Sequence, residues 1–63
     1  MSIGRNLTIA LYDKGLSARE LALKIGVSEA MISKIKSNER NPSIGVAKRI
    51  AKELNITVDK LIK

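Results

Sequence analysis

The sequence contains no cysteine and no histidine, and these two absences exclude several classes of protein. Neither a disulfide framework nor a zinc site built on thiolate or imidazole ligands is possible. There is also no cysteine nucleophile and no histidine to transfer protons near pH 7. The 6 acidic residues are scattered, so they form no ligand-like cluster for a metal. The sequence therefore predicts a protein that is not an enzyme and that uses no metal or cofactor.

Glycine-rich and aromatic segments are missing as well. The 4 glycines are isolated from one another, which excludes a Gly-rich phosphate-binding loop. Tyr12 is the only aromatic residue, so the stacking side chains with which proteins bind single-stranded RNA are absent. No secretory segment and no apolar run long enough to cross a bilayer can be recognised. We therefore expect a soluble, cytoplasmic protein with no membrane partner.

Basic residues, in contrast, are abundant. The 63 residues include 12 Lys+Arg and 6 Asp+Glu, which gives a net charge of +6. A chain of this length corresponds to one domain, residues 1–63. The charge suits a polyanionic partner such as nucleic acid, although a basic surface also serves simply to keep a small protein in solution. Charge alone does not choose between these two interpretations.

Apolar residues recur at helical spacing in five stretches, each preceded or followed by residues typical of helix ends. Ser17 and Glu20 form the capping-box pattern S-x-x-E. Ser28, Ser43 and Thr57 stand where the N-caps of later helices are expected. The sequence predicts an all-α fold with helices at about 3–14, 18–25, 29–37, 44–54 and 58–62.

Residues 18–37 fit a helix-turn-helix. Ala22 supplies the small residue needed where the two helices cross, and Gly26 supplies a residue that tolerates positive φ in the turn. Asn38 is expected to end the second of these helices in a left-handed conformation, and Pro42 prevents the helix from continuing. The apolar residues predicted to fix both helices to the core are Leu21, Ile25, Val27, Ile32 and Ile35.

The helix at 44–54 carries a broad apolar stripe, formed by Ile44, Ala47, Ile50, Ala51 and Leu54. Val46 widens this stripe, and Ile56, Val58 and Ile62 add apolar surface near the C-terminus. A domain of this size does not obviously bury all of these side chains. The surplus predicts a two-fold interface at Val46, Ile56 and Val58. The alternative is that these residues pack internally around the last helix.

The stretch KGLSARELALKIGVSEAMISKI, followed by NERNPS, resembles the Cro/CI-type (XRE-like) helix-turn-helix family of phage and bacterial repressors. The resemblance covers nearly the whole chain. It implies a compact five-helix, lambda-repressor-like domain that dimerises and binds palindromic operators. Many members have a Gln that contacts the DNA backbone where this chain has Ala18. Many also pair an Arg with a Glu where this chain has Leu11 and Lys36, a joint replacement that leaves no buried charge unpaired.

Helical geometry separates two sides of the helix at 29–37. One side is apolar, and the other is short and polar, which suits a major groove about 12 Å wide. Lys34 is the leading candidate for a base contact, to guanine O6 and N7, with a solvated charge as the alternative. Glu29 could accept from cytosine N4 or simply stabilise the helix N-terminus. Ala30 could touch a thymine methyl, and Ser33 a base, a phosphate or only water.

Phosphate contacts are expected at helix N-termini, whose free N–H groups bind anions. The resemblance places the beginnings of the second and fourth helices against the DNA backbone. Arg40 is the strongest candidate, whereas Arg19 could point to solvent. The full set of predicted phosphate-contact residues is Ser17, Ala18, Arg19, Lys36, Arg40, Asn41 and Ser43. A solvated outer face is expected for Lys48, Arg49, Lys52, Lys60 and Lys63.

These features together predict a sequence-specific regulator of transcription that binds double-stranded DNA, with repression as the expected outcome. The helix at 29–37 would enter the major groove of a palindromic operator, and two copies would place these helices about 34 Å apart. The alternative is an antitoxin or adaptor that uses the same fold to bind another protein. The small, polar, basic outward side of the helix argues against that alternative.

Overall fold

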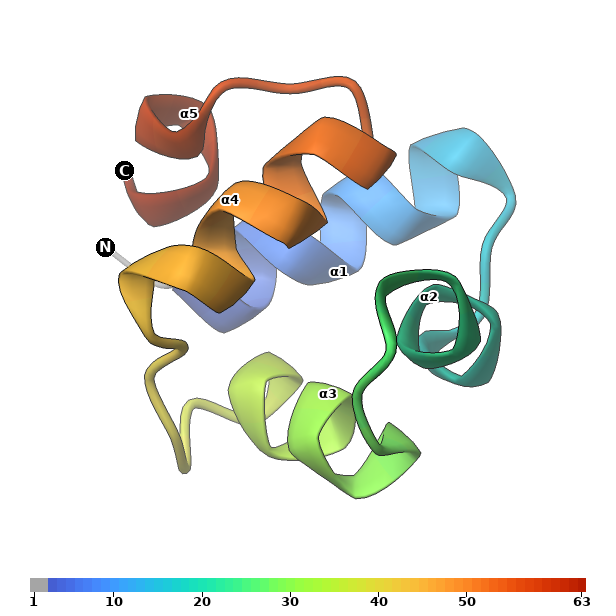
Figure 1. Ribbon diagram of the computed structural model, residues 1–63. Helices are drawn as coiled ribbons and strands as arrows, with labels where there is room; N and C mark the ends of the chain where they lie inside the picture. Colours follow the sequence, from blue (N-terminus) through green and yellow to red (C-terminus); the bar gives the residue numbers. More distant parts are fainter. Residues whose placement is uncertain (1–2) are drawn as a thin grey trace.

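The computed structural model describes residues 3–63, and within this range the backbone forms five helices and no strand. The helices are α1 (Ile3–Lys14), α2 (Ala18–Ile25), α3 (Glu29–Lys36), α4 (Ile44–Glu53) and α5 (Val58–Ile62), as Figure 1 shows. The predicted all-α fold and the order of its helices are confirmed.

Two helices end one residue before their predicted bounds. Ser37 follows α3 with φ −87° and ψ 1°, and Leu54 follows α4 with φ −89° and ψ 1°. The next residue in each case is an asparagine in the left-handed region, Asn38 with φ 64° and Asn55 with φ 56°. Each helix therefore stops because the chain turns through a positive-φ asparagine, as was predicted for Asn38.

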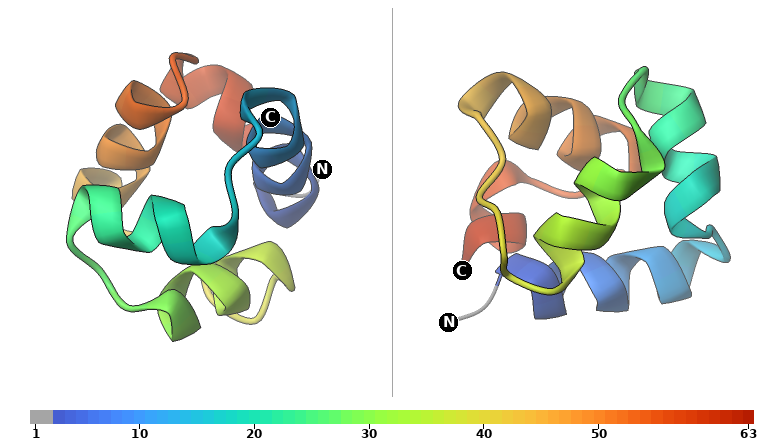
Figure 2. Two further views of the ribbon diagram at one scale, coloured as in Figure 1. Left: turned by 90° about the vertical axis from the view of Figure 1, so that its right-hand side faces the viewer. Right: turned by 90° about the horizontal axis from the view of Figure 1, so that it is seen from below.

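The helices form a closed ring of contacts around one core. α1 packs against α3 and α5, α2 packs against α3 and α4, and α4 packs against α5. Figure 2 shows the helices arranged around a shared centre, which their apolar side chains fill. The buried apolar side chains are those of Leu7, Ala10, Leu11, Leu21, Ala22, Ile25, Ile32, Ile35, Ala47, Ile50, Ala51, Leu54 and Leu61. Within residues 3–63 no polar or charged residue is buried.

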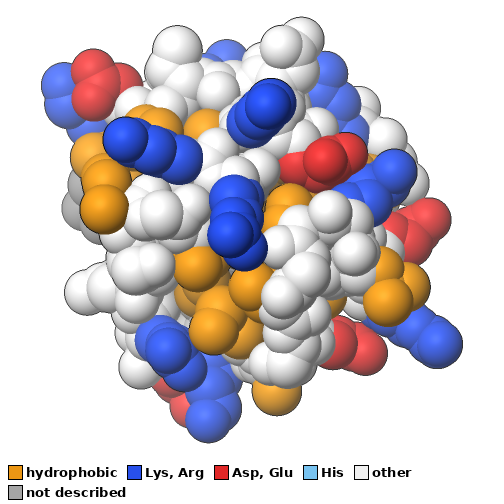
Figure 3. All heavy atoms as spheres, viewed as in Figure 1, with side chains coloured by type: hydrophobic (Ala, Val, Ile, Leu, Met, Phe, Trp, Pro, Cys, Tyr) orange, Lys and Arg blue, Asp and Glu red, His pale blue; other side chains and the backbone are white. Residues whose placement is uncertain are grey.

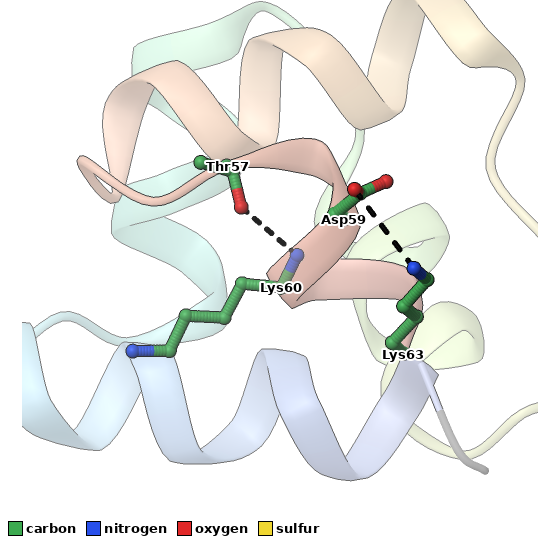
Figure 4. A network of polar contacts seen from close by, with 4 residues as sticks. All are labelled: Thr57, Asp59, Lys60 and Lys63. Atoms are coloured by element: carbon green, nitrogen blue, oxygen red, sulfur yellow. Dashed lines mark hydrogen bonds and ion pairs between the residues drawn. The ribbon is translucent and has the colours of Figure 1, made fainter.

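Short polar side chains begin four of the helices, as the sequence predicts. The capping box of α2 is complete: Glu20 N donates to Ser17 Oγ at 3.0 Å, and Ser17 N donates to Glu20 Oε1 at 2.9 Å. Hydrogen bonds to its carboxylate, first from the Ser17 backbone N–H and then from the Ser17 side chain, lower the pKa of Glu20 from its ordinary value of 4.5. Ser28, Ser43 and Thr57 each accept a backbone N–H three residues further on, and Figure 4 shows the bond to Thr57.

The beginning of α1 lies against the end of α3. Gly4 is buried, and its N–H donates to Asn38 Oδ1 at 3.0 Å. A Cβ atom at position 4 would overlap the carbonyl oxygen of Lys36 and lie 2.8 Å from that of Ile35. Glycine is therefore required here by close approach of two backbones, a role that its isolated place in the sequence did not indicate.

A polar contact joins α2 to α4. Arg49 Nη1 donates to the carbonyl oxygen of Ile25 at 3.3 Å, at the end of α2, where carbonyl groups lack helical partners. Lys24 Nζ lies 3.9 Å from Glu53 Oε2 in the same region. Arg49 is exposed, as predicted for a solvated outer face, and its guanidinium in addition caps a neighbouring helix.

The apolar stripe of α4 is confirmed except at its first residue. Ala47, Ile50 and Ala51 are buried, as is Leu54 directly after the helix, but Ile44 is 67% exposed. The first turn of α4 extends past the core, to a hollow that Ile44 and the 46%-exposed Ile62 both line. Among residues 3–63 no other element covers Ile44 there, so a residue with the correct period still faces solvent.

Candidate nucleic-acid interface

The turn between α2 and α3 has the geometry that the sequence predicts. Gly26 ends α2 with φ 75° and ψ 35°, and its N–H donates to the Ala22 carbonyl at 2.9 Å. Val27 N donates to the same carbonyl at 3.0 Å. Ala22 is only 3% exposed, and α2 and α3 pack directly against each other. The predicted roles of Ala22 as the small crossing residue and of Gly26 as the left-handed turn residue are confirmed.

This packing leaves one side of α3 uncovered. Ile32 and Ile35 are fully buried, and Met31 is half-buried against the core. Figure 1 shows α3 along one edge of the molecule, with no helix below it in that view. The structure brings together on the exposed side of α3 the four predicted base-contact residues, Glu29, Ala30, Ser33 and Lys34.

The predicted phosphate-contact residues lie at the beginning of α2, at the end of α3 and in the turn that leads to α4. Those that are exposed are Ser17, Arg19, Arg40, Asn41 and Ser43. Ala18 and Lys36 are half-buried, and Ala18 packs against the core. The methyl group of Ala18 therefore offers little to a ligand, whereas its backbone N–H at the beginning of α2 has no helical partner.

The cap hydroxyls of α2 and α4 differ in the hydrogen-bond donor that they keep available. Ser17 Oγ accepts from Glu20 N, and Ser43 Oγ accepts from Val46 N at 3.2 Å. The bond at Ser43 uses an acceptor lone pair and leaves the O–H proton, whereas the Ser17 hydroxyl also bonds to the Glu20 carboxylate. A phosphate oxygen at either helix N-terminus would meet free backbone N–H groups, and at the beginning of α4 it would also meet a hydroxyl donor.

The charge of this surface is nearly balanced. Around α3, the first turn of α2 and the turn after α3, the cations are Arg19, Lys34, Lys36 and Arg40, and the acids are Glu20, Glu29 and Glu39. Most of the net charge of +6 therefore lies elsewhere. Figure 3 shows the face over α4, where Lys and Arg side chains are spread among fewer acidic ones. The surface around α3 therefore presents individual cations and helix N-termini rather than a broad basic field.

Sequence reasoning overlooked one acidic residue of this surface. Glu39 lies in the turn after α3, and its Oε2 accepts from Ser37 Oγ at 2.7 Å. Its N–H donates to the Lys34 carbonyl at 2.9 Å, which fixes the turn. The sequence feature that could have identified Glu39 as part of this surface is its position next to Arg40 in the turn NERNPS. A carboxylate here opposes phosphate approach and restricts how closely the turn can approach a DNA backbone.

The three residues predicted for a two-fold interface are all half-buried. Val46, Ile56 and Val58 pack against the core within their own chain. Their apolar surface is therefore partly used inside the domain, and the prediction that they meet a second copy stays a prediction.

The described chain offers neither a metal site nor a membrane span. Among residues 3–63 no three His, Cys, Asp or Glu side chains gather where they could hold a metal ion. None of the helices in this range has the length and apolar character needed to cross a bilayer.

Comparison with known proteins identifies the family. A helix-turn-helix family matches residues 11–61. Among solved structures, the chain is similar to SinR, a master regulator for biofilm formation, in complex with DNA. This chain is 34% identical to SinR in that structure and has a TM-score of 0.91 with it, over 97% of this chain and 98% of the SinR chain. A second solved structure, the N-terminal DNA-binding domain of SinR from Bacillus subtilis, is also 34% identical to this chain. Its TM-score is 0.90, and the match covers 97% of this chain and 90% of that domain.

A second solved relative is the restriction-modification controller protein C.AhdI from Aeromonas hydrophila. It is 27% identical, with a TM-score of 0.88 over 94% of this chain and 89% of that one. No curated protein sequence matches the chain. The family match spans most of the sequence and agrees with the α2–α3 geometry, so the chain belongs to the helix-turn-helix family, of the Cro/CI (XRE-like) type.

Proposed function

We propose that this protein is a sequence-specific regulator of transcription that inserts α3 into the major groove of a palindromic DNA operator. The observation that carries the proposal is the uncovered side of α3, which holds Glu29, Ala30, Ser33 and Lys34 and lies between two capped helix N-termini. The similar SinR structure, in complex with DNA, supports the same assignment. A small polar helix side between two anion-binding ends fits a groove bordered by phosphates.

In this arrangement α3 supplies sequence recognition and its neighbours supply position. Lys34 donates to guanine O6 and N7, and Ala30 touches a thymine methyl. Glu29 accepts from cytosine N4, and its carboxylate is repelled by the major-groove acceptors of guanine and thymine. The beginning of α2 holds one phosphate, and Arg40 with the beginning of α4 holds another.

The remaining parts of the proposal follow from this activity. The protein acts by binding rather than by catalysis, as a single domain over residues 1–63. It represses transcription in the bacterial cytoplasm, where its operator lies. Two copies bind one palindrome, because a single α3 contacts too few bases to define a genomic site.

The experiment that tests the proposal is selection of bound duplexes from a random DNA pool, followed by fluorescence titration of the selected duplex and a scrambled one at physiological salt. We expect the selected duplex to bind at least about 10³-fold more tightly, within the usual range for specific recognition. Equal affinity for the selected and the scrambled duplex would contradict sequence-specific recognition. Equal affinity together with capture of a protein partner without DNA would instead support the antitoxin or adaptor function.

A further inference from the structure

Three of the four exposed residues of α4 that follow its first turn are cations. They are Lys48, Arg49 and Lys52, and the fourth is Glu53. The surface around α3 holds four of the 12 Lys+Arg and three of the 6 Asp+Glu, which leaves eight cations against three acids on the rest of the chain. Figure 3 shows basic side chains spread over the face that α4 forms. We call Lys24, Lys48, Arg49 and Lys52 the α4 basic face.

Lys24 belongs to this face because the end of α2 lies beside α4. A hollow of about 420 Å³ separates the two helices there, and its lining consists of Lys24, Ile25, Arg49, Lys52 and Glu53. Lys24 Nζ lies 3.9 Å from Glu53 Oε2, so the one carboxylate of the hollow is already paired. The positive charges of Arg49 and Lys52 are left without a carboxylate in the hollow.

The cations of the α4 basic face differ in how firmly they are held. Arg49 Nη1 donates to the carbonyl oxygen of Ile25 at 3.3 Å, which fixes the guanidinium while its other N–H groups remain donors. Among residues 3–63, Lys48 and Lys52 make no hydrogen bond or ion pair through their side chains. An anion that approaches this face therefore meets one fixed guanidinium and two free ammonium groups.

The helix dipole explains only part of this arrangement. Lys24 and Lys52 lie in the last turns of α2 and α4, where a cation interacts favourably with the helix C-terminus. Lys48 lies four residues before Lys52, and like charges at this spacing slightly destabilise a helix. A surface that served only solubility would intersperse acids among these cations. The position of Lys48 therefore indicates a negatively charged partner.

The chemistry of the face favours a DNA backbone over an acidic protein. In α4 no large apolar side chain is exposed after Ile44. Protein interfaces are rich in aromatic residues and poor in lysine, whereas Lys and Arg bind phosphate groups whatever the base sequence. A DNA molecule held by α3 also keeps its other duplex segments at a high local concentration. A second duplex segment is therefore the partner that fits this face.

The α4 basic face and the exposed side of α3 are different sides of the molecule. Figure 1 shows α3 along one edge and α4 crossing the molecule above it, and the view from below in Figure 2 places α4 along a border. Only the beginning of α4, at Ser43, belongs to the surface proposed to contact the operator. A duplex bound by α3 therefore leaves Lys48 and Lys52 open to a second one.

We propose that the α4 basic face binds the phosphate backbone of a second duplex segment, without sequence preference, while α3 holds the operator. This inference rests on the proposed function. One protein molecule then joins two segments of DNA. Four phosphate contacts give a slope of log affinity against log salt concentration of about −3.6, so affinity for the second segment falls roughly 150-fold between about 50 and about 200 mM salt.

The test is a capture assay with two DNA molecules. The selected duplex is fixed to beads, which are loaded with protein, washed and exposed to a labelled scrambled duplex in low salt. The variant is Lys48→Gln/Lys52→Gln. The control, Lys14→Gln/Lys60→Gln, removes the same charge from two exposed lysines that line a different hollow, between α1 and the turn after α4. Lys14 and Lys60 also lie in last helical turns, so both variants change the helix dipoles.

We expect the loaded wild type to capture the labelled duplex, and Lys48→Gln/Lys52→Gln to capture it about tenfold less, because two phosphate contacts are lost. The salt slope of capture should fall by about 1.8 in that variant. The Lys14→Gln/Lys60→Gln control should capture as the wild type does. Both variants should load onto the selected duplex with the wild-type preference, and thermal unfolding of each verifies the fold.

Several outcomes would overturn the inference. They are capture by the wild type no greater than by beads without protein, and equal losses in the two double variants, which would indicate a general charge effect. Undiminished capture by Lys48→Gln/Lys52→Gln would assign bridging to separate copies that each use α3. Capture of labelled polyglutamate in place of the duplex would assign the face to an acidic protein. Failure of the proposed function is distinct, since the wild type would then load equally onto selected and scrambled beads.

Discussion

The backbone N–H of Gly4 donates to Oδ1 of Asn38, 34 residues further along the chain, at 3.0 Å. Asn38 therefore has two roles: its positive φ of 64° ends α3, and its side chain caps a free N–H at the beginning of α1. The carbonyl of Lys36 lies so close to Gly4 that no side chain fits between them. The helix proposed to enter DNA is thus held at its C-terminal end by α1.

Gly4→Ala tests this close approach. The new Cβ would overlap the Lys36 carbonyl oxygen, so α1 and α3 must separate. We expect a loss of about 1–3 kcal/mol in the free energy of unfolding, as for other overpacked sites. Urea unfolding followed by circular dichroism measures it.

Gly45→Ala is the matched control. Gly45 is also helical, but a Cβ there would meet nothing within 4 Å. We expect this variant to gain up to about 1 kcal/mol from the better helix propensity of alanine. Equal effects of the two substitutions would show that the Gly4 contact carries no special constraint.

The capping box predicts a pH dependence of stability. Ser17 lowers the pKa of Glu20 below its ordinary value of 4.5. The carboxylate therefore stabilises the folded state above pH 4.5, and this contribution is lost as the pH falls through the lower pKa of the folded protein. Glu20→Gln keeps a hydrogen-bond acceptor for Ser17 N but cannot ionise.

Urea midpoints of the wild type and Glu20→Gln should accordingly differ most near neutral pH and converge on acidification towards pH 3. The variant is expected to be the less stable of the two at neutral pH, where the charge also favours the N-terminus of α2. A difference that stays constant across the titration would contradict a role for the ionised carboxylate.

Lys34 and Arg40 should separate base contacts from phosphate contacts. Lys34→Ala is expected to weaken binding to the selected duplex by about 1–3 kcal/mol and to relax the sequence preference at one base position. Arg40→Ala is expected to weaken binding to all DNA sequences alike. It should also lower the slope of log affinity against log salt concentration by about one unit. Titrations on selected and scrambled duplexes at several salt concentrations measure both effects.

Lys48→Ala serves as the control, because Lys48 is an exposed cation of α4 outside the surface around α3. It should leave the preference for the selected duplex unchanged. Identical behaviour of the Lys34 and Arg40 variants would show that the assignment of base and phosphate contacts is wrong.

Local features of this fold were predictable from the sequence, whereas long-range ones were not. The capping box of Ser17 and Glu20, the left-handed Gly26 and the left-handed Asn38 each depend on a few neighbouring residues. Gly4 and Arg49 depend on partners 34 and 24 residues away, and no local pattern marks such contacts. Ile44 has the correct helical period, but its exposure is decided by where the core ends.

The candidate site shows the same division. Periodicity placed Lys34 and Ser33 on the side of α3 opposite Ile32, and the structure leaves both of them exposed. The total charge of +6, however, says nothing about its distribution, and the surface around α3 proves nearly balanced. Which side chains contact DNA depends on the docked geometry, which neither periodicity nor composition determines.

The central claim is that the exposed side of α3 recognises bases through the major groove, and base analogues test it most directly. Replacing guanines of the selected duplex with 7-deazaguanine removes the N7 acceptor from the major groove, and replacing them with inosine removes the N2 donor from the minor groove. We predict that one 7-deazaguanine position lowers affinity by about 1–3 kcal/mol while inosine leaves it unchanged. Loss of affinity with inosine, and none with 7-deazaguanine, would contradict the account.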